Sequence, residues 1–524
     1  VPFTDNLTVA NSVIFNDGDS AYIQRTPSSE TNRDTWTLSY WIKRCTIGTL
    51  QVFFQHGTDQ NNCTQHQFDT SNRLNYQMTN SGSYTDSLIS NRTFEDTSKW
   101  YHIVLAVDTT QSTEANRVRM YVDGDEITSW DTANYPAQNV DTDMNTTTAF
   151  RIGGQVSGSL IGVDCYLAEV NFIDGQQLTP ASFGVTDTST GRWIPKTVSP
   201  YPTTTTDIAV TVVSSGGNKY ALDGVTQGTV TLIEGATYKF DQSDSSNSGH
   251  PLRFSTTSDG THGGGSEFTS GVTTVGTPGS SGAYTQITVP TGTATLYYYC
   301  TQHSGMGGTA NTQDQYGTNG FRLKFQDSSA LGDDTSGNGN DFTATNLTAS
   351  DQTIGSPTSN YSNFTTNGST GTISLAEGNL KPTFSSSAGD ASGSAVPSTF
   401  RIPVGKWYFE YYIAGTNSVL INMAVAKTNT SFSGRLFTLS GFKTYYPYVR
   451  SFYEGGSELV TDTDMPIGED DVTVGVYIER KSDGTVNLWA GDDQASKGTF
   501  AFQSSMNPAT GANAVGNLFN PGDE

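Results

Sequence analysis

Short β-type runs that end at tight-turn residues recur along the whole chain, and helical periodicity is almost absent. Alternating or β-rich runs occur at 35–42, 117–122 and 472–478, and such runs are typical of strands. The second run is followed by Asp123-Gly124 and the third by Asp483-Gly484. In such pairs glycine supplies the positive φ that a tight hairpin turn requires. The pattern predicts an all-β protein built from hairpins.

The composition favours folded β modules over disorder, nucleic-acid binding or a membrane span. Aromatic residues make up 11% of the chain and give every section surface to bury. Lys and Arg total 27 against 51 Asp and Glu, a net charge of −24, and the clustered cations that phosphate contacts need are missing. The longest apolar runs, such as 103–107, are about five residues, far below the ~20 of a membrane helix. We therefore predict no nucleic-acid partner and no membrane span.

Two polar stretches divide the chain into modules. Its 524 residues exceed the roughly 100–200 residues of one domain. The Pro-, Thr- and Ser-rich stretch 194–207 suits an extended linker, and the small polar stretch 307–320 forms a second seam. We predict three β-sandwich modules in series, at residues 1–195, 207–315 and 321–524.

The four cysteines are too few for a disulfide scaffold in a chain of this length. Cys45 and Cys63 could pair with each other or be two buried thiols. The sequence leaves both alternatives open.

The first module resembles a laminin-G or concanavalin-like jelly roll. The segments that carry this resemblance follow the family's order: 37–43, 100–105 leading to 120–124, and 167–172 followed by Leu178-Thr179. Together with 15–19 and 25–28, they resemble the opening of marine tailed-phage fibre and virion proteins. Sandwiches of this family often bind glycans, some of them through calcium, and others hydrolyse glycans. The resemblance implies a host-surface glycan or receptor as a partner.

Acidic residues in this module are candidates for both roles. A glycan hydrolase needs two carboxylates ~5–9 Å apart. The acidic run that comes nearest to this requirement is 123–126, but it lies in a predicted hairpin turn, and a solvated turn is the favoured interpretation. We therefore predict that the chain is not an enzyme. Asp59, Asp69 and Asp164 could ligate calcium through loop oxygens, although single solvated acids are the commoner interpretation.

The middle module contains the most specific constellation in the chain. Cys300, His303 and Met306 fall within seven residues after a β run, and His250 lies about fifty residues upstream. A blue-copper site needs two imidazoles, one thiolate and a weak axial thioether. The Cys-x2-His-x2-Met loop is similar to that of amicyanin-like cupredoxins, and 235–240 resembles the strand before their first histidine.

This resemblance spans roughly residues 207–315 and implies a cupredoxin-like Greek key with a type 1-like copper site. His250, Cys300 and His303 are the predicted equatorial ligands, and Met306 is the predicted axial ligand. The alternative is that all four are packing or turn residues. His262 is predicted to be a solvated loop residue.

The third module resembles a SPRY sandwich from about residue 370 onward, on the segments 404–412, 471–477 and 484–489. The lead-in 333–342 looks like segments beside such domains in phage proteins; its Asp and Asn could hold calcium, but a Gly/Asn turn is commoner. SPRY sandwiches normally close with another aromatic-rich strand, which is not clear before Glu524. We expect that another segment supplies this strand or that the natural polypeptide continues.

Taken together, the modules predict a virion surface protein, a phage tail fibre or appendage that adsorbs to host cells by binding glycans or another surface receptor. It would contact other virion proteins and form a homo-oligomer, with a trimer as the default, because repeated weak sites gain avidity. Two alternatives stay open. The chain could be a secreted glycan hydrolase with accessory binding domains, or a copper-binding redox protein.

Overall fold

The computed structural model confirms an all-β chain. It describes residues 7–156, 162–196, 205–290 and 292–365, and then the separated segments 369, 373–384, 396–399, 402–413, 423–426, 442–446, 451–454, 457–461, 472–482, 486–492, 501–502 and 508–509. Within these residues the helical turns are short 3₁₀ turns, at Asp17–Asp19, Glu114–Asn116, Pro180–Ser182, Ser245–Asn247, Gly260–Gly263 and Ala349–Asp351. None of the described helices is long and apolar enough to span a bilayer.

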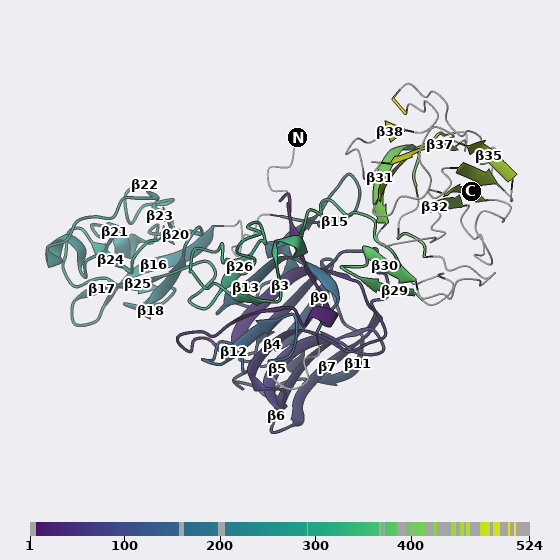
Figure 1. Cartoon of the computed structure of the whole chain (residues 1–524). Helices are drawn as coiled ribbons and strands as arrows, with labels where there is room; N and C mark the ends of the chain where they lie inside the picture. The colour runs from purple at the N-terminus through teal and green to yellow at the C-terminus, as the bar shows by residue number, and fades with distance from the viewer. Residues whose placement is uncertain are drawn as a thin grey trace. The chain divides into compact units, whose positions relative to one another are not determined.

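The first sandwich has two large sheets (Figure 1). One runs in the order β10 (Asp125–Glu126), β9 (Val118–Val122), β8 (Tyr101–Asp108), β3 (Thr35–Arg44), β13 (Cys165–Asp174), β1 (Ser12–Phe15) and β28 (Gln352–Thr353), with β26 (Phe321–Leu323) also paired to β13. The other runs β11 (Trp130–Asn134), β7 (Ser83–Thr93), β6 (Arg73–Asn80), β5 (Asn62–Phe68), β4 (Gln51–Asp59), β12 (Ala149–Ile152), β2 (Tyr22–Arg25) and β27 (Thr343–Thr345). A separate hairpin joins β14 (Gly184–Thr186) to β15 (Trp193–Pro195).

The turn between β9 and β10 confirms the hairpin predicted at Asp123-Gly124. Asp123 has a φ of 55° and Gly124 a φ of 93°, and Val122 pairs with Asp125 across the turn. The four cysteines are all buried and form no disulfide, so Cys45 and Cys63 are two buried thiols.

The middle module is a second two-sheet sandwich with its own apolar core. One sheet runs β18 (Val225–Thr226), β17 (Asn218–Leu222), β16 (Thr206–Ser214), β20 (Thr237–Asp241), β23 (Tyr284–Thr288) and β22 (Val272–Val275). The other runs β19 (Val230–Ile233), β25 (Gly308–Gln313), β24 (Leu296–Cys300) and β21 (Leu252–Ser255). The pairs β16–β20 and β19–β25 are parallel.

After the middle module the chain returns to the first sandwich. The sequence had instead predicted a third module at residues 321–524. Strands β26, β27 and β28 pair with β13, β2 and β1, and the division between two compact units falls between Tyr361 and Ser362. Local β patterns predict strands but not their distant partners, so the sequence pattern assigned these strands to the C-terminal module. The middle module is therefore inserted within the first domain.

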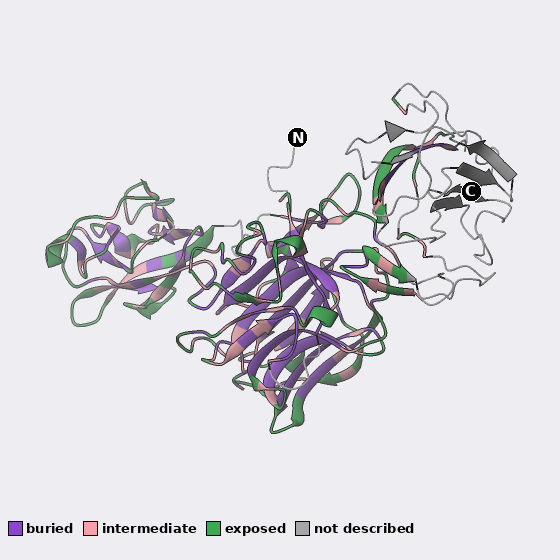
Figure 2. Ribbon diagram, viewed as in Figure 1, coloured by how far each residue is buried: buried purple, intermediate pink, exposed green. Residues whose placement is uncertain are grey.

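The returning segment also completes the first core. The rings of Phe172 and Phe321 are stacked with centroids 5.5 Å apart, and Phe321 meets Phe342 at 4.7 Å. All three side chains are buried in the cluster between the sheets, which are drawn largely as buried ribbon in Figure 2. Burying such rings supplies a large apolar driving force.

The lead-in 333–342 is folded as a hydrogen-bonded turn of this domain. The Asp334 carboxylate accepts from the backbone N–H of Arg322, Ser336 and Asn340, each at 2.9 Å, and from the Ser336 hydroxyl at 2.8 Å. This arrangement agrees with the Gly/Asn-turn interpretation of the segment.

The second unit is described only in part. The three segments that carry the SPRY resemblance overlap β31 (Gly405–Ile413), β36 (Val472–Arg480) and β37 (Val486–Asp492), which pair in that order and continue to β38 (Ala501–Phe502). A second sheet contains β32 (Met423–Ala426), β33 (Phe442–Tyr446), β34 (Ser451–Glu454) and β35 (Ser457–Thr461), and a hairpin joins β29 (Ile373–Ala376) to β30 (Lys381–Phe384). The predicted Asp483-Gly484 turn and the last residues lie outside the described part.

A buried ion pair connects β26 to β13. Glu169 sits at an irregularity of β13 with a φ of 47°, and its carboxylate accepts from Arg322 Nε at 2.9 Å and Nη2 at 2.8 Å. The two side chains are only 6% and 11% exposed. Removing one partner of such a pair leaves the other charge buried and uncompensated.

We therefore expect Arg322→Leu to lower the free energy of unfolding of the first sandwich by about 3–5 kcal/mol. Hydrogen exchange of β13 peptides, followed by mass spectrometry across a urea series, measures this locally. The matched control is Arg119→Leu, which breaks a partly exposed pair with Glu126 and should cost about 0–1 kcal/mol. Equal costs for the two variants would contradict the account.

Three histidines are buried in the first sandwich. Burial lowers the pKa of His56 to about 3, of His66 to about 4 and of His102 to about 3. His102 is held by Ser39 Oγ and by the indole N–H of Trp193, both at 2.9 Å. All three are thus neutral when folded, whereas an unfolded histidine titrates near 6.5.

Acid should therefore destabilise this domain. Below about pH 6.5 the unfolded chain binds more protons than the folded chain, so the stability present above that pH is lost as the pH falls toward 4. The expected slope is up to about 1.4 kcal/mol per pH unit for each histidine. Urea unfolding between pH 7.5 and 5 measures it, and a flat profile would show that these side chains are not buried as neutral imidazoles.

Candidate metal centre

Strand register brings two of the predicted ligands together. In the antiparallel pair β21–β24, Leu252 lies opposite Cys300. His250 precedes Leu252 by two residues and so lies beside the end of β24. The loop from β24 to β25 then carries His303 back to the same point.

The distances fit a shared ion. Cys300 Sγ lies 3.9 Å from His250 Nδ1 and 3.8 Å from His303 Nδ1, and the three ligand atoms lie within 4.8 Å of one another. Around one ion with metal–sulfur and metal–nitrogen distances of about 2.3 and 2.0–2.1 Å, sulfur and nitrogen lie about 3.6–3.8 Å apart at trigonal or tetrahedral angles. Small side-chain shifts would therefore place all three atoms on one metal.

The centre lies at the rim of the core. Cys300 and His250 are buried, whereas His303 is exposed. Burial, with the neighbouring His303, lowers the pKa of His250, which favours the neutral imidazole that a metal needs. Met306 is 1% exposed and belongs to the same apolar core cluster as Cys300.

Residues outside the predicted ligand set contact the candidate ligands, and the sequence analysis did not single out most of these surrounding residues. Asn218 Nδ2 lies 3.4 Å from His250 Nε2, and Gln242 Nε2 donates to the His250 carbonyl at 2.8 Å. His262, predicted as a solvated loop residue, is exposed, but its Nε2 lies 3.1 Å from the Cys300 carbonyl oxygen. These residues lie far from Cys300 in the sequence, so no local pattern links them to the candidate site.

Two acids of the run 123–126 are paired with cations. Asp123 Oδ2 lies 2.8 Å from Lys99 Nζ, and Asp123 Oδ1 accepts from the His102 backbone N–H at 2.9 Å. Glu126 instead accepts from Arg119 Nε at 2.8 Å. The carboxylates of Asp123 and Glu126 are thus each engaged by a different cation.

The three calcium candidates also stay apart. Asp59 and Asp69 each accept backbone N–H groups of their own turns, and Asp164 bonds the Asp17 N–H and the Thr46 hydroxyl. In the described part of the chain, the one group of three His, Cys, Asp or Glu ligands within reach of a metal is His250, Cys300 and His303.

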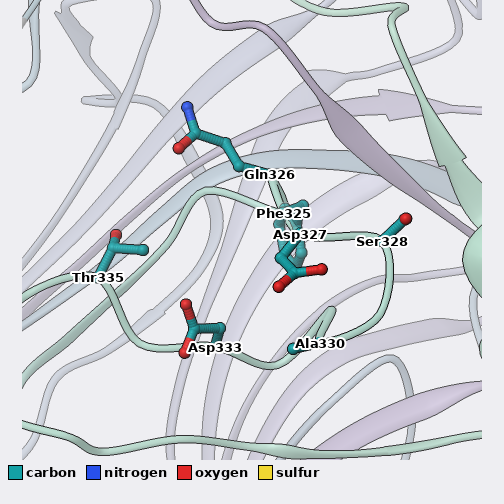
Figure 3. A pocket seen from close by; sticks show the side chains of 7 residues that line it. All are labelled: Phe325, Gln326, Asp327, Ser328, Ala330, Asp333 and Thr335. Atoms are coloured by element: carbon teal, nitrogen blue, oxygen red, sulfur yellow. The ribbon is translucent and has the colours of Figure 1, made fainter.

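A separate cavity of about 410 Å³ lies in the loop after β26 (Figure 3). Its lining comes from one stretch of chain: Phe325, Gln326, Asp327, Ser328, Ala330, Asp333 and Thr335. The Asp327 carboxylate is occupied by the N–H and hydroxyl of Ser329, at 2.8 and 2.6 Å. Asp333 belongs to the segment 333–342, whose Asp and Asn the sequence offered as possible calcium ligands.

Comparison with known families bears on the first domain. Residues 17–182 match a family model described as the concanavalin A-like lectin/glucanases superfamily. The first domain has a concanavalin A-like lectin fold. This agrees with the jelly-roll resemblance found in its sequence. A search of curated proteins finds no match.

Solved structures give distant likenesses. They include a heptameric SAP-like pentraxin from Limulus polyphemus, 13% identical with a TM-score of 0.26, covering 33% of this chain and 80% of the pentraxin. Another is the enzymatically active domain of tailspike protein 2 from bacteriophage CBA120, 13% identical with a TM-score of 0.23, covering 30% of this chain and 25% of that one. A third is the Ruminococcus gnavus IT-sialidase CBM40 bound to α2,3 sialyllactose, 8% identical with a TM-score of 0.20, covering 31% and 84%.

Proposed function

We propose that this chain is a virion surface adhesin, a phage tail fibre or related appendage that attaches to host cells by binding surface glycans. The observation that carries the proposal is the lectin-type fold of the first domain, with its family match over residues 17–182. The opening segments that resemble tailed-phage fibre proteins supply the virion context. Assembly as a homo-oligomer, a trimer by default, would strengthen individually weak glycan contacts.

We also propose that the protein binds glycans without cleaving them. The acidic run of the first domain supports this, because Asp123 is paired with Lys99 and Glu126 with Arg119. A retaining or inverting hydrolase instead needs two facing carboxylates that share the scissile bond.

The whole chain should therefore bind a subset of bacterial or algal polysaccharides on a glycan array and release no reducing sugar from them. Cys300→Ser is the matched control, because it alters only the middle module and should leave glycan binding unchanged. Absence of binding to any polysaccharide or host cell would refute the adhesin proposal. Release of reducing sugar would favour the hydrolase alternative.

We further propose that the middle module binds copper in a type 1-like site. The observation that favours this function is the meeting of His250 Nδ1, Cys300 Sγ and His303 Nδ1, with Met306 buried in the same core cluster. Two imidazoles and one thiolate with a weak thioether are the ligand set of such sites. Bound copper would supply one-electron redox chemistry, and the chain's own residues would hold it at the rim of the core.

Cu(II) added to the whole chain should bind at about one equivalent and give an intense visible thiolate-to-copper band. Cys300→Ser should abolish the band, whereas Cys63→Ser, at another buried thiol, should not. Met306→Leu should keep the colour and raise the reduction potential, because losing the axial donor destabilises the oxidised metal more. Equal copper binding by wild type and Cys300→Ser would overturn this assignment.

A further inference from the structure

Lys43 of β3 is a buried lysine that reaches the C-terminal end of the first compact unit. It is only 3% exposed, and its Nζ lies 5.6 Å from the ring centroid of Tyr166, which belongs to an apolar cluster. The amino group donates to Asn360 Oδ1 at 3.0 Å and to the Tyr361 carbonyl oxygen at 2.9 Å. Strand β3 is thus joined to a side chain 317 positions later in the sequence.

The surroundings of Lys43 favour the uncharged amine. Burial lowers its pKa from 10.5 to about 8, and the charges of Cys45 and Asp96 oppose part of that shift. On the order of a tenth of such side chains is then neutral at pH 7. A neutral lysine amine in a desolvated site is a nucleophile.

The Asn360 side chain presents its amide carbon to this amine. A C=O bond is about 1.23 Å long, so with Oδ1 at 3.0 Å the Asn360 Cγ lies no farther than about 4.2 Å from Nζ. Atoms poised to react lie about 3–3.5 Å apart, so a small movement of either side chain suffices. On the other side of the amide, Asn360 Nδ2 donates to the Ser98 carbonyl oxygen at 2.8 Å.

The turn that holds the Asn360 amide also carries a carboxylate. Asp96 Oδ1 accepts from the Ser98 backbone N–H at 2.9 Å and from the Ser98 hydroxyl at 2.5 Å. Ser98 therefore joins the carboxylate of Asp96 to the amide of Asn360. A carboxylate in such a place can carry a proton from one nitrogen to another.

We propose that Lys43 and Asn360 are the site of an intramolecular isopeptide bond, which forms after folding with loss of ammonia. The lone pair of the neutral Nζ attacks Cγ, the Nζ–Cγ bond forms and the Cγ–Nδ2 bond breaks. One Nζ proton passes, through Asp96, to the departing nitrogen, which leaves as NH₃. Nothing is oxidised or reduced, and the product is a secondary amide whose nitrogen keeps one proton.

The bond would close the first domain where the chain passes on to the second unit. The other ties at this seam are not covalent: the Ser356 hydroxyl donates to the Val9 carbonyl at 2.6 Å, the Ser12 hydroxyl donates to the Gly355 carbonyl at 2.5 Å, and β28 pairs with β1. A covalent link would keep the seam closed when the second unit is pulled. This use rests on the proposed adhesin function, whereas the bond itself does not.

Mass spectrometry of the intact, purified whole chain tests the proposal. Wild type should weigh about 17 Da less than its sequence, the mass of one ammonia. Lys43→Arg and Asn360→Ala should each have the full mass of their sequence, because a guanidinium stays protonated and alanine has no amide. The matched control is Lys99→Arg, which changes a partly exposed lysine paired with Asp123 and should keep the loss.

Tryptic peptides locate the bond. Trypsin should not cut after a linked Lys43, so peptide 34–44 should be joined to the peptide that contains Asn360. Wild type at its full sequence mass would overturn the proposal, and this result does not depend on how the variants fold. Loss of ammonia without the branched peptide would also overturn it, because Asn338-Gly339 can lose the same mass as a succinimide. A linked chain that binds no host surface would keep the bond and refute only the adhesin function.

Discussion

Strand β13 holds the first domain together because its two edges are occupied by partners from three distant parts of the chain. One edge pairs along its length with β3, and the other is shared by β1 and β26. The irregularity at Glu169 separates the residues of β13 that pair with β1 from those that pair with β26. The buried Glu169–Arg322 ion pair joins β13 to β26 at this point. Since β26 follows the middle module in sequence, this pairing requires the chain to leave the domain and return.

The insertion has a physical consequence for the metal centre. The middle module has its own core and its own sheets, and both of its ends join segments of the first domain. The candidate ligands of the metal centre come from the register of β21 with β24 and from the short loop that follows Cys300. The proposed glycan-binding and metal-binding functions therefore rest on separate cores within one compact unit, so each could be tested by substitution without dismantling the other.

Local features of the fold could be predicted from sequence, whereas long-range partners could not. Asp123-Gly124 marks its hairpin because only a few residues tolerate positive φ there. Cys300, His303 and Met306 indicate the candidate metal loop because their spacing is local. The return of Phe321 to the first core carries no local signal, since an apolar strand packs equally well against either neighbour.

The same limit explains why the sequence analysis did not single out Tyr220 of β17. Its hydroxyl and its backbone N–H donate to the carbonyl oxygens of His250 and Met306, which lie 30 and 86 positions away, and in sequence it reads as an ordinary inward-facing tyrosine of a strand. Glu169 is similar, because a positive φ at a non-glycine residue within an apolar strand contradicts local preference. In both cases the tertiary structure sets the role of the residue.

Anomalous scattering at the copper edge from crystals of the whole chain grown with Cu(II) tests the assignment of the metal centre most directly. The account predicts one strong peak within about 2.0–2.3 Å of His250 Nδ1, Cys300 Sγ and His303 Nδ1. A copper-replete crystal with no peak at this point, or with its peak at another group of residues, would contradict it.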